Sequence, residues 1–295
     1  MNKVTFICWP KPFSDKTEYY PLQRNALLSW KKLDITEKIV VIGNESGNKE
    51  FCKEYDIIHE PEVGETNKFG TPLLKSILKQ GYKYCNVGDS VCYINSDIIL
   101  LKNYNDTVCS FLKSDLSQPT YLGIGQRYDW NSPEAIDFDD LDWEINIEKK
   151  TILDGKLQSF CLIDYFLHKA HSYPVDELPT LAIGRLHWDR WLVGYGVRNF
   201  DTTVDFSNTV TAIHQETSYL LNNSKIDKDN HAKSEECITN CGIDIHYGMN
   251  INDSQYISKN VDGKIKFVVR PKHFVNSRVL IDGKWYDDSR EDKSI

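Results

Sequence analysis

The chain has 295 residues, of which 40% are hydrophobic and 26% are charged, and its formal net charge is −8. This is the composition of an ordinary folded protein and excludes extensive disorder. The acidic balance, with no dense run of Lys and Arg, argues against a nucleic-acid partner. No apolar run reaches the roughly 18 residues of a membrane-spanning helix, so we expect no transmembrane segment.

The N-terminal segment and the cysteines indicate a reducing compartment. Val4–Trp9 is the first apolar run, and it has the length of a strand rather than of a secretory signal. The eight cysteines show no small-domain disulfide spacing, so we expect a cytoplasmic protein. Cys237 and Cys241, with His231 and His246 nearby, invite a zinc interpretation, but their spacing matches no standard zinc motif and favours a structural role.

The first hundred residues alternate between short apolar runs and helical patterns. We expect strands at 4–9, 38–42, 57–58 and 91–101, and helices at 22–33 and 72–79. Pro72 would lie in the first turn of the second helix and Gly81 just past its end. The last strand is interrupted only by Asn95-Ser96-Asp97. This β-α-β-α-β order predicts an α/β fold with a mainly parallel sheet and helices on both faces.

Beyond residue 118 the pattern changes to shorter segments. We expect strands at 121–125, 210–214 and 265–269, a helix at 137–150, an apolar segment at 159–167, an aromatic segment at 185–197, a polar loop at 222–230 and a hairpin at 278–285. The most economical organisation is a main domain, 1–221, followed by a small C-terminal appendage, 222–295.

Asp97 is an acidic residue inside an otherwise apolar strand. A carboxylate is costly to bury unless it binds a metal or is fully paired. At the carboxyl end of a strand in an open α/β sheet, it would face the crevice where ligands bind. A divalent cation held there would bridge two phosphates and stabilise a departing diphosphate. The alternative is an Asp that caps a turn.

A second polar cluster is Gly184-Arg185-Leu186-His187-Trp188-Asp189-Arg190-Trp191-Leu192, in which two Trp residues flank one Asp. Sugars pack their C–H faces on planar rings, and burial raises the pKa of an Asp toward that of a working base. The alternative is an aromatic core helix with Asp189 near its N-terminus. A third segment, 210–215, ends a short apolar strand with His214, which is either a metal ligand or a structural His.

Together these segments resemble a group of GT-A glycosyltransferase-like proteins. In that group a Gly-Arg-x-x-Trp-Asp-x-Trp-Leu motif precedes a strand that ends in His-Gln, as in the two segments above. Further matches occur in the family's order at 69–74, 93–99, 125–129 and 163–166. The resemblance covers roughly residues 3–220. It implies a GT-A type, Rossmann-like sheet, with a nucleotide-sugar-binding half at 1–118 and an acceptor half at 119–221.

The resemblance implies a metal-dependent transfer of a sugar from a UDP- or GDP-sugar donor to a glycan or other hydroxyl acceptor. It places Mn²⁺ or Mg²⁺ at Asp97. His214 is the expected second ligand, because Asn95 stands where the family usually has a first acid. Asp189 occupies the motif of the base that deprotonates the acceptor in an inverting enzyme.

The resemblance also implies substrate contacts. Those to the nucleotide-sugar fall on Pro10, Lys11, Arg24, Asn95, Arg127 and Arg185, the last two because a planar guanidinium binds phosphate well. Those to the acceptor fall on Asp164, Trp188 and Trp191. Retention of configuration stays open. The other functions considered are a non-catalytic carbohydrate-binding protein and a sugar-1-phosphate nucleotidyltransferase, although the latter's usual Gly-rich signature after the first strand is missing.

Overall fold

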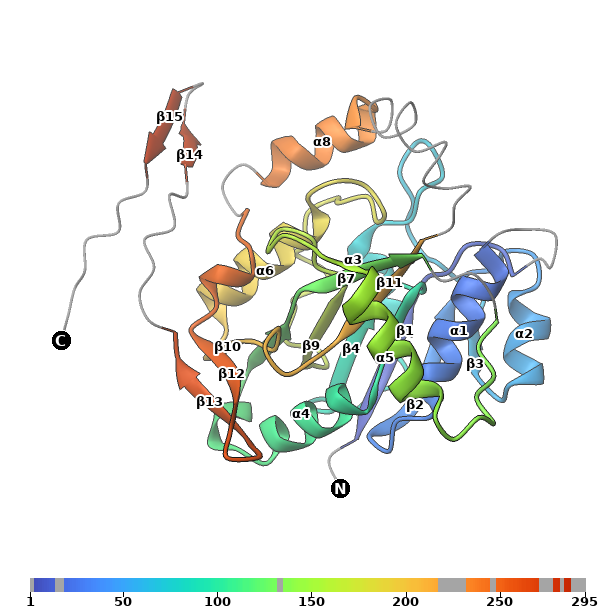
Figure 1. Cartoon of the computed structure of the whole chain (residues 1–295). Helices are drawn as coiled ribbons and strands as arrows, with labels where there is room; N and C mark the ends of the chain where they lie inside the picture. The colour runs from blue at the N-terminus through green and yellow to red at the C-terminus, as the bar shows by residue number, and fades with distance from the viewer. Residues whose placement is uncertain are drawn as a thin grey trace.

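The computed structural model describes residues 3–13, 19–131, 135–216, 232–244 and 248–270, and the backbone of 278–281 and 284–287. A nine-stranded sheet with helices on both faces forms the body of the molecule (Figure 1). Its strands are β1 (Val4–Cys8), β2 (Thr36–Ile42), β3 (Ile58–Glu60), β4 (Ser90–Ile94), β6 (Tyr121–Ile124), β9 (Tyr165–Lys169), β10 (Thr202–Asp205), β12 (Tyr256–Val261) and β13 (Lys264–Val269). They lie in the order β13-β12-β10-β6-β9-β4-β1-β2-β3.

Most neighbours in this sheet run parallel. The parallel pairs are β1–β2, β1–β4, β2–β3, β6–β10 and β10–β12. Strand β9 runs antiparallel to β4 and β6, and β13 runs antiparallel to β12. The predicted α/β class, with a mainly parallel sheet, is therefore confirmed.

A smaller sheet lies beside the main one. It contains β5 (Ile98–Leu100), β11 (Ala212–Glu216), β7 (Arg127–Asn131) and β8 (Lys156–Leu157), in the order β5-β11-β7-β8. A separate hairpin pairs β14 (Arg278–Ile281) with β15 (Lys284–Asp287). The expected strand at 91–101 thus divides at Asn95-Ser96-Asp97 into β4 and β5, which belong to different sheets.

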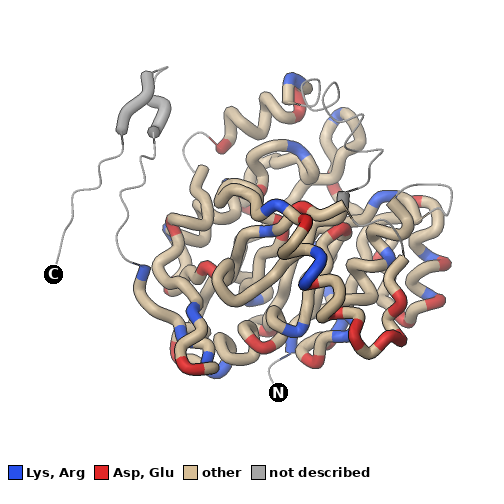
Figure 2. Tube along the Cα trace, viewed as in Figure 1, with Lys and Arg blue, Asp and Glu red and all other residues tan. Residues whose placement is uncertain are grey.

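The α-helices are α1 (Tyr19–Lys31), α2 (Asn48–Glu54), α3 (Leu74–Tyr82), α4 (Lys102–Leu112), α5 (Trp143–Asp154), α6 (Trp188–Asn199) and α8 (Glu235–Asp244). Short 3-10 turns occur at Asp115–Ser117 and Ile251–Asp253. Among the helices of the described residues, none combines the length and apolarity that crossing a bilayer requires. Basic residues are spread along the trace rather than gathered in one stretch (Figure 2).

The core has a layer on each face of the main sheet. Alternate residues of a strand point to opposite faces. Phe6 of β1 stacks on Trp30 of α1 with ring centroids 5.7 Å apart, in the layer that also holds α2 and α4. Ile7 belongs to the other layer, which holds α3 and α6. Every residue of β1 is buried, as expected for a central parallel strand.

Two expectations about the second helix were wrong. Helix α3 begins at Leu74, and Pro72 instead forms a β-bridge with Thr66. Gly81 lies inside α3 rather than beyond its end. A Cβ at this position would lie 2.3 Å from Cδ1 of Ile7, so the glycine lets the helix approach the sheet closely.

The C-terminal part of the chain contributes to the main sheet. Strands β12 and β13 come from the expected appendage, 222–295, and β12 pairs with β10. The domain boundary expected at residue 221 stays a prediction, and strands from both sides of it belong to the same sheet. The expected loop at 222–230, and the zinc candidates His231 and His246, lie outside the described residues.

Candidate functional site

Asp97 lies in the turn between β4 and β5, where the chain leaves the main sheet for the smaller one. This turn follows the carboxyl end of a central strand, the usual place for ligands in open α/β sheets. Gln215 fixes the turn, because its backbone N–H and its Nε2 both donate to the carbonyl oxygen of Asp97, at 3.3 and 3.0 Å. The same Nε2 donates to the Leu22 carbonyl, and Asn25 donates to the Gln215 side chain.

His214 lies between two carboxylates. Its Nε2 is 3.5 Å from Oδ2 of Asp97, and its Nδ1 is 3.2 Å from Oδ1 of Asp129. The second contact follows from register, since His214 of β11 is paired directly with Asp129 of β7. The predicted pair Asp97 and His214 is therefore brought together, with Asp129 as a third member.

Asp97, His214 and Asp129 form a cluster that we call the Asp97 corner. A second ring of charged groups surrounds this corner. Arg127 donates from Nε to Oδ1 of Asp129 at 2.8 Å and from Nη1 to Oδ2 of Asp164 at 2.5 Å. Asn95 donates to the other Asp164 oxygen at 2.6 Å. Because Asp164 is 5% exposed and both its oxygens accept hydrogen bonds, these three predicted site residues form a paired network that supports the corner.

The charges of the corner set its protonation. Burial alone would raise the pKa of Asp97, but the positive charge of His214 outweighs it and holds that pKa below its usual value. The pKa of Asp129 is lowered against its burial in the same way, by His214 and Arg127. Burial would lower the pKa of His214, whereas the carboxylates of Asp97 and Asp129 raise it to about 10. At neutral pH an imidazolium thus holds the two carboxylates together.

The corner has a donor set that suits a hard divalent cation. Oδ1 of Asp97 is buried and has no hydrogen-bond partner among the described residues, although a buried carboxylate oxygen is normally paired. Carboxylate oxygen is a preferred ligand of Mn²⁺ and Mg²⁺, and neutral imidazole is a common metal ligand in proteins. Within the described ranges, no group of three or more His, Cys, Asp or Glu is arranged as a metal site.

The loop after β1 approaches the Asp97 turn through one glutamine. Oε1 of Gln23 accepts from the backbone N–H of Lys11 at 2.6 Å and from the Ser96 hydroxyl at 3.2 Å. The Lys11 ammonium lies 4.0 Å from the centroid of the Tyr19 ring. Pro10 is buried beside this loop. The predicted nucleotide-binding residues Pro10 and Lys11 therefore lie next to the turn that carries Asp97.

Arg24 and Arg185, two predicted nucleotide-sugar contacts, are directed at the protein. Arg24 donates from Nη1 to the carbonyl of Ile136 at 3.1 Å. Arg185 donates from Nε to Glu236 at 2.7 Å and from Nη2 to Thr71 at 3.2 Å. In this arrangement both guanidinium groups connect segments of the fold.

Asp189 lies in the first turn of α6, the position that the alternative of an aromatic core helix gave it. Its pKa is raised to about 7, mainly by burial and also by the negative charges of Asp164 and Asp244, against a backbone hydrogen bond from Arg190 that lowers it. The influence of Asp164 shows that Asp189 lies within electrostatic reach of the Asp97 corner. A carboxyl group that titrates near neutral pH is suited to accept a proton.

The two Trp residues of the motif lie in the core. Trp188 and Trp191 are each 5% exposed. Trp188 packs against Tyr93 and Phe166, with ring centroids 5.4 and 5.5 Å apart. Their placement agrees with the alternative of an aromatic core helix, because a buried indole offers no open face to a sugar.

Asp129 and Glu236 are the residues that the sequence interpretation missed. The alternating pattern of a strand could have predicted Asp129 as a site residue, since Arg127 and Asp129 are two apart on one strand and share a face. Nothing in the sequence signalled Glu236, because its partner Arg185 lies far away in the chain.

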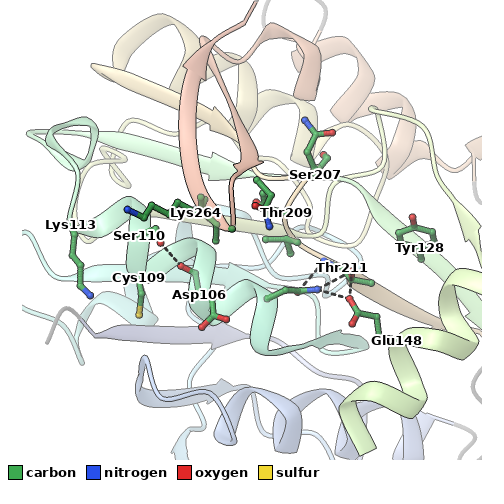
Figure 3. Close-up of a pocket in the computed structure, with 16 residues that line it drawn as sticks. Asp106, Cys109, Ser110, Lys113, Tyr128, Glu148, Ser207, Thr209, Thr211 and Lys264 are labelled. Atoms are coloured by element: carbon green, nitrogen blue, oxygen red, sulfur yellow. Dashed lines mark hydrogen bonds between the residues drawn. The ribbon is translucent and has the colours of Figure 1, made fainter.

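A groove of about 970 Å³ lies between α4, α5, residues 207–211 and the turn that joins β12 and β13 (Figure 3). Its wall contains a network in which Asn103 donates to Glu148 at 2.8 Å and to the Thr211 hydroxyl at 3.0 Å. Tyr128 also lines it, from the face of β7 opposite to its charged neighbours. None of the predicted site residues is among the described residues that line this groove, so the candidate site rests on the titratable corner instead.

Comparison with models of protein families and with curated protein sequences gives no match in either case. Among solved structures, the chain is similar to S. aureus TarS, with 13% identity and a TM-score of 0.48 over 85% of this chain and 43% of that one. It is similar to glucosyl-3-phosphoglycerate synthase from Mycobacterium tuberculosis in complex with Mn²⁺, UDP and phosphoglyceric acid, with 12% identity and a TM-score of 0.45 over 93% and 88% of the two chains.

A third similar structure is 4-diphosphocytidyl-2C-methyl-D-erythritol synthase from Anaerococcus prevotii, with 12% identity and a TM-score of 0.40 over 77% of this chain and 99% of that one. The chain spans less than half of the length of TarS. At such distances, the function has to be inferred from the residues of the chain itself.

Proposed function

We propose that this chain is a metal-dependent glycosyltransferase that moves a sugar from a nucleoside-diphosphate sugar to a hydroxyl group of a glycan acceptor. The observation that supports it most is the convergence of Asp97, Asp129 and His214 beyond the carboxyl end of β4. A separate carboxyl group, that of Asp189, titrates near neutral pH within electrostatic reach of this corner. Two acidic groups with different pKa values suit two different tasks.

The first task is to hold the diphosphate. The residues that would bind Mn²⁺ or Mg²⁺ are His214 and Asp97, whose Oδ1 has no hydrogen-bond partner in the described part of the chain. When bound, such an ion would neutralise the charge that develops on the departing nucleoside diphosphate. Asp129 would orient the His214 ring through Nδ1, as carboxylate partners of metal-binding imidazoles do.

The second task is to activate the acceptor. In an inverting reaction, the acceptor hydroxyl attacks the anomeric carbon from the face opposite to the leaving group while a base takes its proton. Asp189 is the proposed base. Its raised pKa makes the carboxylate a stronger proton acceptor than an ordinary Asp, while leaving a substantial part of it ionised at neutral pH.

The Trp residues next to Asp189 contribute indirectly. Since the rings of Trp188 and Trp191 are buried, they anchor the first turn of α6 to the core rather than touch a sugar. The apolar surroundings they provide also help to desolvate the carboxyl group. This combination of a rigid helix end and a desolvated carboxylate is typical of a preorganised catalytic group.

The test is a panel of UDP- and GDP-sugars incubated with the protein and Mn²⁺, with release of nucleoside diphosphate as the readout. We expect slow hydrolysis of one donor, abolished by EDTA and by Asp97→Asn. Asp106→Asn is the matched control, because Asp106 is a half-exposed acid whose side chain pairs with Lys102 on α4. If no donor gives metal-dependent turnover or thermal stabilisation, the proposed function is wrong.

A second experiment distinguishes a transferase from a carbohydrate-binding protein. Asp189→Asn should keep binding of the donor, measured by calorimetry with Mn²⁺, and should lose transfer to the acceptor. A binding protein would show the same donor affinity in both forms and no transfer in either.

A further inference from the structure

Helix α8 presents a stripe of three polar side chains to the loop that precedes α6. Glu236, Asn240 and Asp244 are spaced four residues apart, so they share one face of the helix. Each one contacts the loop 182–187, which leads into the first turn of α6. The side chains of Asn240 and Asp244 are buried, although Asn and Asp are mostly exposed in proteins.

The centre of the stripe binds the loop backbone. Asn240 accepts from the N–H of Ala182 at 2.9 Å through Oδ1 and donates to the Ala182 carbonyl at 2.8 Å through Nδ2. The amide thus satisfies both backbone groups of one residue, as a neighbouring strand would. Next to it, the Leu186 N–H contacts Sγ of Cys237 at 3.5 Å.

The two ends of the stripe bind side chains of the loop. Asp244 lies 2.8 Å from Nδ1 of His187, with its own side chain 4% exposed. Glu236 binds Arg185 through one oxygen and Asn67 through the other, at 2.7 and 2.6 Å. Helix α8 therefore joins two loops, the one that contains Asn67 and the one that precedes Asp189.

The loop needs such support because its backbone is strained. Gly184 has φ +67° and His187 has φ +73°, both in the left-handed region. For a residue with a Cβ, this conformation costs about 1–2 kcal/mol. His187 is the N-cap of α6 and offers no side-chain hydrogen bond to the helix, so contacts from outside have to hold it.

The chain after α8 also reaches α6. The N–H of Met249 contacts the carbonyl of Arg190 at 3.3 Å, and the N–H of Gly248 donates to the carbonyl of Asp244 at 2.8 Å. Figure 1 shows α8, in orange, lying outside the sheet and above α6. Asp189 thus lies in the chain between His187, which Asp244 of α8 contacts, and Arg190, which Met249 contacts.

We propose that α8 is a positioning element of the catalytic site, in which Glu236, Asn240 and Asp244 hold the 182–187 loop and thereby aim Asp189 at the acceptor. Since Asp189 is the base only under the function proposed above, the catalytic part of this role rests on that function. Asp244 acts in two ways: it fixes His187 by contact, and its charge adds to burial and to Asp164 in raising the pKa of Asp189. The region beyond residue 220, outside the family resemblance, would therefore be required for transfer.

The experiment compares Asp244→Asn and Asn240→Ala with Ile238→Ala. Ile238 is 61% exposed and lies two residues from Glu236, on the other side of the helix. The first readout is the titration of the Asp189 carboxyl carbon by ¹³C NMR, assigned by its loss in Asp189→Asn. The charged groups that act on Asp189 are Asp164 and Asp244, and its carboxyl group also accepts backbone hydrogen bonds from Asp189 and Arg190. Hydrogen exchange of the Ala182 amide is the second readout.

We expect Asp244→Asn to shift the Asp189 titration to lower pH, because one negative neighbour is removed. We expect Asn240→Ala to accelerate exchange at Ala182 and to lower kcat, by up to on the order of 100-fold for a misplaced catalytic group. The KM for the donor should stay unchanged in both variants. Ile238→Ala should change none of these quantities.

The proposal is overturned if Asp244→Asn leaves the Asp189 titration unchanged, or if Ile238→Ala produces the same effects as the stripe variants. If Asn240→Ala does not fold, the isosteric Asp244→Asn variant decides the question alone. Failure of the wild-type protein to turn over any nucleotide-sugar would refute the proposed function. The titration and exchange measurements would still decide whether α8 positions Asp189.

Discussion

His214 and Asp97 lie 3.5 Å apart, Nε2 to Oδ2, although they are far apart in the chain and only His214 belongs to a strand. Strand β11 runs antiparallel to β5, which places His214 opposite Ile98, the residue that follows Asp97. Gln215 then binds the Asp97 carbonyl, so that the end of β11 and the β4–β5 turn form one unit. Backbone pairing therefore fixes the relative position of the two residues that form the proposed metal site.

Removing either proposed ligand should remove the response to metal. We expect Mn²⁺ to raise the Tm of the wild-type protein and to leave the Tm of Asp97→Asn and His214→Ala unchanged, because each variant keeps only one ligand. Donor hydrolysis should fall by at least about 100-fold, since even supporting residues of metal sites cost 10–100-fold. Equal Tm shifts in wild type and Asp97→Asn would contradict the assignment.

The metal-free protein should lose stability as pH rises above neutrality. The pKa of His214 is raised to about 10, above its ordinary value of 6.5, because Asp97 and Asp129 favour the imidazolium. A raised folded-state pKa stabilises the protein fully below pH 6.5, and this contribution is lost between about pH 6.5 and 10. Urea unfolding in EDTA at several pH values measures it, with His214→Gln as the variant that should lack this loss.

Much of this site was predictable from sequence because strand-end polar residues interrupt apolar runs. Asp97 and His214 both end or interrupt such runs, and the family motifs predicted them to be two ligands of one metal ion. The α/β class followed from the alternation of apolar runs. The position of Asp129 required the register of β7 against β11, which depends on long-range pairing.

Other features were beyond the sequence for physical reasons. Buried and exposed aromatic residues look alike in a sequence, so Trp188 and Trp191 were assigned to the acceptor although they lie in the core. Gly81 suggested a helix end, but close packing on Ile7 keeps it inside α3. The α8 stripe was invisible, because polar residues at helical spacing are normally solvated.

Gln215 should be required for the shape of the metal corner. Gln215→Ala would remove the side-chain hydrogen bonds to the carbonyl oxygens of Asp97 and Leu22 and the one from the amide of Asn25, while the backbone N–H at position 215 still reaches Asp97. Each buried hydrogen bond that is lost costs roughly 0.5–1.5 kcal/mol, so we expect a clear drop in the free energy of unfolding and weaker Mn²⁺ binding. Gln118→Ala is the control, since Gln118 is exposed. Unchanged Mn²⁺ affinity in Gln215→Ala would show that the turn does not depend on the hydrogen bonds of the Gln215 side chain.

Asp189→Asn should be inactive and more stable than the wild type. A carboxyl group whose folded-state pKa is raised destabilises the protein once it ionises, and the amide carries no charge to bury. We expect a gain on the order of 2 kcal/mol above pH 7, since one pKa unit is worth about 1.4 kcal/mol and partial exposure reduces the effect. Transfer should fall by about 10²–10⁴-fold. Denaturant unfolding at pH 3.5, 5 and 8 provides the check, because the gain should shrink as the pH falls from 7 towards the ordinary Asp pKa of 3.8 and nearly vanish below it.

The rate of transfer should depend on a single ionisation near neutral pH. Burial raises the pKa of Asp189 to about 7, and the base acts only when it has lost its proton. We therefore expect kcat/KM to rise about tenfold per pH unit below that value and to level off above it. The profile should be measured at saturating Mn²⁺, because metal binding by His214 is itself pH-dependent. A profile that is flat between pH 5 and 8 under these conditions would mean that another group accepts the proton.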